Sequence, residues 1–242
     1  MTGPNSISGF GTSISHLNQR NSRLNKLDEQ LSSGSKIPKF SYDAAGGAIS
    51  QKLRALFSQY EVEINNEADS YNRLATKEGA YEAMGDNLQR IRELQVAYRN
   101  DTLTDGDRKG IQLEIDLLSQ NIKNISEQAE FNTKKVVEPG EELKNIIDNG
   151  IAAGGDFVDK ALREVSSERS QTGAEMNNIE KAINGKMIAF ENTVASYSTI
   201  SDMDFAKGIM EKANLEVMQQ AGTAVLKQMF NISKSGVLKL LE

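Results

Sequence analysis

The chain has 242 residues, with no Cys, no Trp, three Pro and 6% aromatic residues. Its formal charge of -6 and pI near 5.1 argue against a nucleic-acid partner, because phosphate binding requires clustered Lys and Arg. The lack of Cys excludes disulfides and thiolate metal sites. No stretch of about 18 apolar residues occurs, so nothing is expected to span a membrane.

The first predicted helix, residues 5–33, carries an apolar stripe at heptad spacing. Its many Ser and Asn residues weaken intrinsic helicity, so we expect it to form firmly only when the stripe is covered. Gly34 and Pro38 mark a connecting loop, and Asp43 is a suitable N-cap for the next helix.

The longest predicted helix runs from residue 44 to about residue 98 without a proline. At 1.5 Å per residue it would be roughly 80 Å long, about twice the width of a compact domain of this size. It therefore predicts an elongated rod. A turn over residues 100–106 precedes a helix from about Asp107, which can fold back antiparallel.

The middle of the chain is less helical. Residues 131–137 could form one short strand or an extended segment, and residues 138–156 are predicted to be a short linker with a poor helix over 143–147. Helical periodicity resumes at Phe157. Ser201–Asp204 resembles a capping box that opens a last helix, residues 203–242.

The sequence contains no recognisable set of catalytic residues. The single histidine, His16, has no partner in sequence, and no phosphate loop, metal-ligand pair or nucleophile motif occurs. Carboxylate pairs such as Glu61 and Glu63 point to different helix faces. We therefore expect no enzyme activity, no catalytic or metal-binding residue and no cofactor.

These patterns predict an all-α fold, an elongated antiparallel helical bundle or coiled-coil rod with a terminal coiled-coil pair and little or no β structure. The two terminal helices would pair and leave their flanks exposed, which favours assembly with neighbouring copies. A monomeric coiled-coil hairpin remains an alternative. The predicted self-assembly residues are Ile7, Phe10, Ile14, Leu17, Leu24, Leu31, Val217, Val225, Leu238 and Leu241.

Several motifs in order resemble bacterial flagellin. They are Leu27–Gly34, Asp43–Ile49, Thr76–Ala80, Asn87–Leu94, Asp107–Ile115, Gln128–Asn132, Asp202–Ala206, Gln219–Leu226 and Val237–Leu241. The resemblance implies inner-tube segments at 1–42 and 201–242, a rod domain at 43–137 and 157–200, and a linker at 138–156 in place of outer domains. Three features depart from the family: the start Pro4–Ile7, Tyr42 in an acidic position, and the reduced outer domains.

The resemblance also implies a function and partners. The chain would polymerise with itself into the extracellular flagellar filament for motility, after export by the flagellar type III apparatus. The N-terminal residues have neither a basic nor an apolar leader region, so we expect no Sec-type signal peptide. Implied partners are an export chaperone on the C-terminal helix, and hook-associated and cap proteins. No nucleic acid or membrane insertion is expected.

Flagellins are also recognised by a host Toll-like receptor through the rod domain. The matching positions are Gln89, Arg90, Leu94 and Glu114, where Arg90 would offer a planar fork and Leu94 an apolar plug. The other interpretation of these residues is contact between subunits. Two alternative functions remain at this stage: a hook–filament junction protein of the flagellum, and a secreted helical adhesin or binding module.

Overall fold

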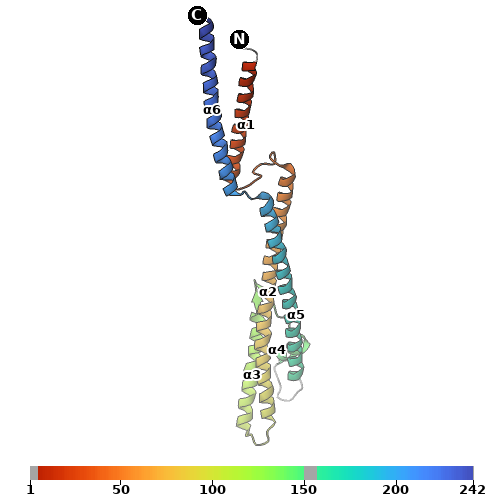
Figure 1. Cartoon of the computed structure of the whole chain (residues 1–242). Helices are drawn as coiled ribbons and strands as arrows, with labels where there is room; N and C mark the ends of the chain where they lie inside the picture. Colours follow the sequence, from red (N-terminus) through yellow and green to blue (C-terminus); the bar gives the residue numbers. More distant parts are fainter. Residues whose placement is uncertain (1–4, 150–156, 242) are drawn as a thin grey trace. The chain divides into compact units, whose positions relative to one another are not determined.

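The computed structural model describes residues 5–149 and 157–241, and it describes side chains for residues 11–148, 157–232, 234 and 235. The described residues form six helices and one small hairpin (Figure 1). The prediction of an all-α fold with little β structure is confirmed. The elements are α1 (Asn5–Ser33), α2 (Ala44–Tyr98), α3 (Asp105–Gln128), β1 (Glu130–Phe131), β2 (Lys134–Lys135), α4 (Glu141–Asn149), α5 (Phe157–Ser201) and α6 (Phe205–Leu241).

The contacts divide the chain into two compact units. One comprises Met1–Ser58 and Glu191–Glu242, and the other comprises Gln59–Phe190. The long helices α2 and α5 each contribute to both units.

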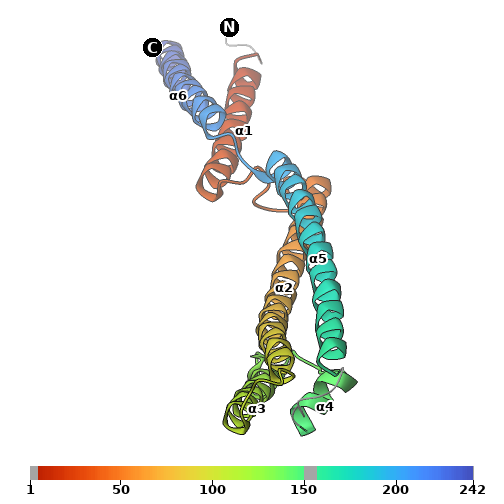
Figure 2. The same cartoon turned by 90° about the horizontal axis from the view of Figure 1, so that it is seen from below.

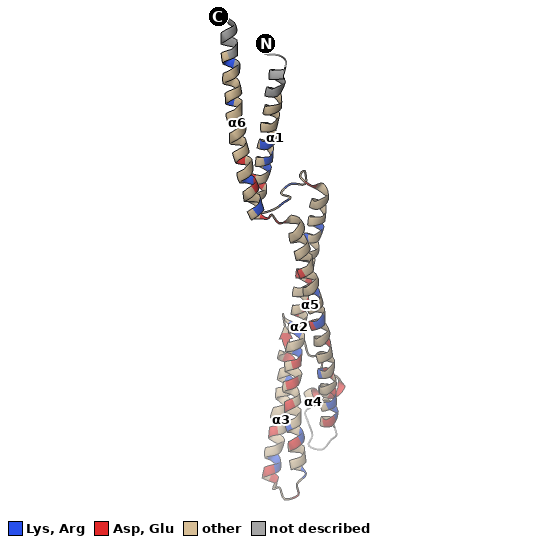
Figure 3. Ribbon diagram, viewed as in Figure 1, with Lys and Arg blue, Asp and Glu red and all other residues tan. Residues whose placement is uncertain are grey.

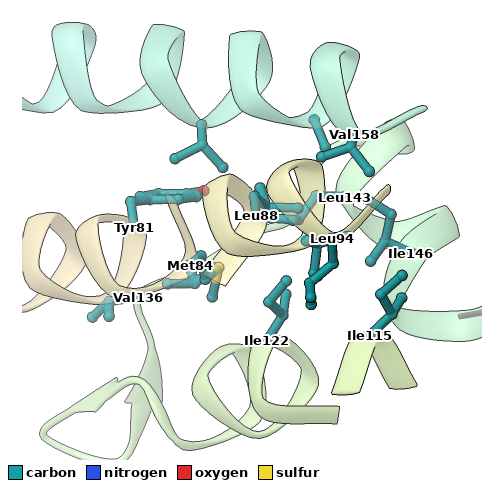
Figure 4. Close-up of a cluster of buried hydrophobic side chains, with 14 residues drawn as sticks. Tyr81, Met84, Leu88, Leu94, Ile115, Ile122, Val136, Leu143, Ile146 and Val158 are labelled. Carbon is teal, nitrogen blue, oxygen red and sulfur yellow. The ribbon is translucent and has the colours of Figure 1, made fainter. Parts of the chain in front are cut away.

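In the unit of residues 59–190, α2 lies between α3 and α5 (Figures 1 and 2). One apolar core joins these helices and α4 (Figure 4). Its fully buried side chains come from every one of the four helices and include Tyr81, Met84, Leu88, Ile91, Ile115, Ile122, Leu143 and Val158. The 3.6-residue period of these positions explains why each helix forms with one face inward.

Ion pairs fix the antiparallel register of α2 and α5. Lys186 lies 3.2 Å from Glu63 and 3.1 Å from Glu67. Further along, Lys77 pairs with Glu168 at 3.0 Å. Hydrogen bonds from Gln59 and Lys186 lower the pKa of Glu63, so this carboxylate stays ionised through mildly acidic pH.

The start of α3 has a complete capping box. The Thr104 hydroxyl accepts the backbone N–H of Asp107, and the Asp107 carboxylate accepts the backbone N–H of Thr104. The helix therefore begins at Asp105, two residues earlier than predicted. These bonds satisfy two of the amides that a helix start leaves unpaired.

A hairpin follows α3, where the sequence left a strand or an extended segment open. Glu130 pairs with Lys135 and Phe131 with Lys134. Asn132 and Thr133 form the turn with φ of 50° and 65°. Two-residue turns of this hand match the twist of the strands, but a β-branched residue is strained at positive φ.

The segment predicted to be a linker with a poor helix contains α4, a nine-residue helix. Leu143 and Ile146 are buried in the core of residues 59–190. Glu164 of α5 accepts the backbone N–H of Glu142 at 3.1 Å and so caps the helix start from another element. The helix is stable despite its length because its apolar face is covered and its first turn is capped.

In the other unit, α1 and α6 pack against each other. The loop after α1 is hydrogen-bonded to the chain between the end of α5 and the start of α6. Lys36 donates its N–H to the Ser201 carbonyl at 2.7 Å, and Met203 donates its N–H to the Gly34 carbonyl at 2.9 Å. Gly34 has φ of +69°, the left-handed conformation that ends a helix and that glycine adopts without strain.

Two predicted caps can be compared with the structure. Asp43 caps α2 as expected, with its carboxylate 2.9 Å from the Gly46 amide. The capping box predicted to begin at Ser201 is wrong, because Ser201 is the last residue of α5. Asp204 is the residue that caps α6, since its carboxylate accepts the Lys207 amide at 3.0 Å.

Candidate assembly surfaces

The terminal helices are joined by a small apolar contact. Leu24 and Leu27 of α1 are buried against Leu215 of α6, and Leu31 and Met203 pack on the same cluster. Among the described side chains of these helices of 29 and 37 residues, three buried leucines are few. Over the described side chains, the contact therefore covers one narrow side of each helix.

Glycines let α6 approach α1 closely. A Cβ atom on Gly208 would lie 2.8 Å from Leu31 Cδ2, and one on Gly222 would lie 3.0 Å from an Arg20 nitrogen and 3.4 Å from Leu17 Cδ2. Gly208, Leu215 and Gly222 recur every seven residues. Residues at this seven-residue spacing lie on one side of α6, and that side faces α1.

Polar contacts set the antiparallel register of this pair. Arg23 pairs with Glu211 at 2.6 Å and Lys212 pairs with Asp28 at 2.7 Å. The Gln219 amide donates to Asn21 at 2.6 Å. These groups are largely exposed, so each contributes little free energy and serves mainly to align the helices.

The predicted self-assembly residues fall into three groups. Leu24 is buried, and Leu17 and Leu31 are half-buried, so these three belong to the contact within the chain. Ile14, Val217 and Val225 are exposed. Ile7, Phe10, Leu238 and Leu241 belong to α1 and α6, but their side chains lie outside the described residues.

The outward side of α6 is apolar and uncharged. Val217 follows Leu215 by two residues, about 200° around the helix, and is 65% exposed. Met210 and Ala224 lie seven residues to either side of Val217 and are also exposed. Figure 3 shows how few charged residues α6 carries along its length. We name Met210, Val217 and Ala224 the outward stripe of α6.

The residues predicted for self-assembly omitted Leu27 and Leu215, which form the contact between α1 and α6, and Met210 of the outward stripe. The heptad of Gly208, Leu215 and Gly222 was the available signal, because glycines at that spacing mark the side of close contact. With that side assigned, the heptad of Met210 and Val217 falls on the opposite side.

A polar groove of about 990 Å³ lies beside α1, the loop after it and the start of α6. Lys26, Lys36, Tyr42 and Lys207 are among its lining residues. Tyr42, which departs from the family pattern, donates its hydroxyl to Glu29 and holds the Lys26 ammonium 4.6 Å from its ring centroid. The tyrosine thus connects the loop to Glu29 of α1, although position 42 itself carries no acidic side chain.

The four residues expected to meet a host receptor do not share one exposed surface. Gln89 and Arg90 are exposed, and the Arg90 guanidinium lies 2.9 Å from Glu114. Hydrogen bonds with Glu114 and then Glu93 raise the pKa of Arg90. Leu94 is only 6% exposed and belongs to the core.

The single histidine, His16, is exposed on α1. Among residues 5–149 and 157–241 no group of three His, Asp or Glu side chains could hold a metal ion. No described helix is long and apolar enough to cross a membrane.

Long helices with uncovered apolar sides are typical of structural subunits that associate with one another. Comparison with known proteins identifies the kind. Residues 12–139 match the bacterial flagellin N-terminal helical region, and residues 156–241 match the bacterial flagellin C-terminal helical region.

The relatives agree along nearly the whole chain. The flagellar filament core protein flaB2 of Brachyspira hyodysenteriae is 32% identical, over 92% of this chain and 94% of its own length. Flagellins of Halalkalibacterium halodurans and Bacillus subtilis are 32% and 31% identical, over 89% and 94% of this chain and 91% and 96% of their own lengths. The chain belongs to the bacterial flagellin family. It is a structural subunit that polymerises with itself into the extracellular flagellar filament of a motile cell.

Proposed function

We propose that the outward stripe of α6, together with the exposed side of α1 at Ile14, is the surface through which copies pack in the inner part of the filament. One observation supports this most: Val217 is 65% exposed on a side of α6 where Met210 and Ala224 continue the heptad. Burying each larger apolar side chain against a neighbour is worth about 1.5–3 kcal/mol. Repeated along a filament, that gain drives assembly.

The proposed division of the chain follows from this role. Residues 1–42 and 201–242 form the inner-tube part, and residues 43–137 and 157–200 form the rod domain. Residues 138–156 stand where longer flagellins have outer domains. The burial of Leu143 and Ile146 supports a rod that ends in a closed core without such domains.

Partners during export follow from the same exposed surface. Before assembly the apolar side of α6 faces water, which favours aggregation. An export chaperone that covers α6 in the cytoplasm would prevent this. Hook-associated and cap proteins would meet the same terminal helices at the two ends of the filament.

Recognition by a host Toll-like receptor is a second proposed function, supported by the exposure of Gln89 and Arg90 and by the half-buried Glu114 that pairs with Arg90. Leu94 would act by holding its turn of α2 in the core rather than by direct contact. Binding of the purified receptor ectodomain tests this. Arg90→Ala should weaken binding several-fold, and unchanged binding would remove Arg90 from the proposal.

Deleting residues 203–242 tests the assembly surface. The truncated chain should keep the helicity of residues 59–190 by circular dichroism, because their core lies outside the deletion. It should form no filaments by electron microscopy at concentrations where the full chain does. Polymerisation of the truncated chain would contradict the role assigned to α6.

A further inference from the structure

A groove of about 710 Å³ runs along one flank of the pair of α1 and α6. Its lining includes His16, Gln19 and Arg20 from α1, and Leu215, Met218 and Val225 from α6. Met218 and Val225 are more than half exposed, and the described residues that line the groove include no Asp or Glu. The groove is therefore apolar along α6 and basic along α1.

Arg20 is a half-buried cation on the floor of this groove. Its guanidinium donates to the carbonyl of Met218 at 3.0 Å and to the carbonyl of His16 at 3.2 Å. These acceptors are neutral, and no carboxylate pairs with Arg20 among the described residues. A cation that an apolar partner covers without a counter-charge loses hydration that nothing replaces. We therefore expect the occupant of the groove to bring a carboxylate.

One carboxylate on the terminal helices lacks a close partner. Among the described side chains of α1 and α6, the carboxylates of Asp28, Glu29 and Glu211 each lie within 2.7 Å of a cation. Glu216 is exposed and lies 4.0 Å from Lys212, which already pairs with Asp28 at 2.7 Å. Glu216 is thus available to a cation of another copy.

Glu216 flanks the outward stripe of α6. It precedes Val217 and so lies about 100° from it around the helix. Ala213 and Ala224 lie on the same side of α6 as Val217, and these small side chains make the stripe a narrow ridge. Ridges of one helix pack into the grooves of others, so the stripe can bring both an apolar surface and a carboxylate into a groove.

The stripe and the groove lie on different sides of α6. Counted from Leu215, which faces α1, Val217 is about 200° and Met218 about 300° around the helix. One copy can therefore insert its stripe into a second copy and at the same time receive the stripe of a third. Such a heterologous contact between equally oriented copies repeats without closing, as a filament requires.

We propose that the outward stripe of α6 inserts into the groove between α1 and α6 of a neighbouring copy, where Glu216 pairs with Arg20. This contact rests on the proposed function, because it specifies what the stripe packs against. The α6 helices of equally oriented copies run parallel. In that arrangement Glu216 falls on the α1 side of the groove, where Arg20 lies. Antiparallel α6 helices would turn Glu216 toward α6 and away from Arg20.

Charge reversal tests the ion pair. R20E places a carboxylate opposite Glu216, and E216R places a guanidinium opposite Arg20. Each variant alone brings like charges together and should raise the critical concentration for polymerisation about tenfold. In an equimolar mixture each variant supplies the charge that the other lacks, so the mixture should polymerise at close to the critical concentration of the unaltered chain. If both monomers keep the helicity of the unaltered chain and the mixture still fails, Glu216 does not pair with Arg20 of another copy.

Disulfide cross-linking tests the register independently, because the natural chain contains no cysteine. The stripe enters antiparallel to α1, so pairing of Glu216 with Arg20 brings Gln220, one turn further along α6, beside His16, one turn back along α1. His16 and Gln220 are both exposed. Filaments from a mixture of the single variants H16C and Q220C should give cross-linked dimers after oxidation, and each variant alone should give none.

The matched control for the cross-link is N18C. Asn18 is also exposed on α1, but it lies about 200° around the helix from His16 and so faces away from the groove. Mixing N18C with Q220C should give no dimer.

Two outcomes of the cross-linking overturn this inference and leave the proposed function standing. One is filaments that form normally without H16C–Q220C dimers. The other is dimers from Q220C by itself, which would mean that the stripes of two copies face each other. Absence of filaments from the unaltered chain would overturn the proposed function, and this contact with it.

Discussion

Replacing Leu143 by alanine tests whether α4 belongs to the folded core. Leu143 is fully buried among side chains of the core. The change removes three carbon groups, worth about 2.4 kcal/mol at about 0.8 kcal/mol each. The cavity left behind adds to this, so the free energy of unfolding should fall by about 3–4 kcal/mol.

Urea unfolding followed by far-UV circular dichroism measures this loss, from the midpoint and slope of the transition that reports residues 59–190. Lys144→Ala is the matched control, since its exposed side chain should change stability by no more than about 0.5 kcal/mol. A loss below about 1 kcal/mol for Leu143→Ala would show that α4 is a loosely attached linker. The account of a closed core would then be wrong.

Three further substitutions probe local features of the same unit. Thr104→Ala removes the hydroxyl that accepts the Asp107 amide and should lower stability by about 1 kcal/mol in the same urea assay. Thr133→Gly relieves the strain of positive φ at a β-branched residue and should raise the free energy of unfolding by about 1 kcal/mol. A decrease in that free energy would show that Thr133 is not strained. Burial, then the charges of Glu168 and Glu164, raise the pKa of Tyr81 to about 12. The unfolded tyrosine, with its pKa near 10, loses its proton first, so stability should fall between about pH 10 and 12. Tyr81→Phe should flatten that fall in pH-dependent unfolding, and an unchanged slope would exclude Tyr81 as its source.

Much of the fold could be predicted because the helices carry long, regular apolar periods. The first helix, 5–33, and the long helix, 44–98, were predicted with their observed bounds. The antiparallel return of α3 followed from a short turn beside a heptad of isoleucines. Such signals are local, and a single sequence contains them in full.

The features that were missed depend on contacts between distant segments. The weak helix over residues 143–147 is stable because Glu164, on another helix, caps α4 and because the core covers Leu143. Periodicity identified Leu94 as a stripe residue, but the resemblance assigned it a surface role that its burial does not suit. On α6, periodicity alone did not separate the side facing α1 from the outward side. Only the close approach at Gly208 and Gly222 settles which is which.

Electron microscopy of the Val217→Glu variant tests the central claim most directly. A charge in the middle of the outward stripe leaves the contact of Leu215 with α1 intact, so the monomer should stay as helical as the unaltered chain. The unaltered chain and the exposed control Lys227→Gln should form filaments at high concentration, and Val217→Glu should remain monomeric even with seeds. Normal filaments from Val217→Glu would contradict the claim that this side of α6 is buried between subunits.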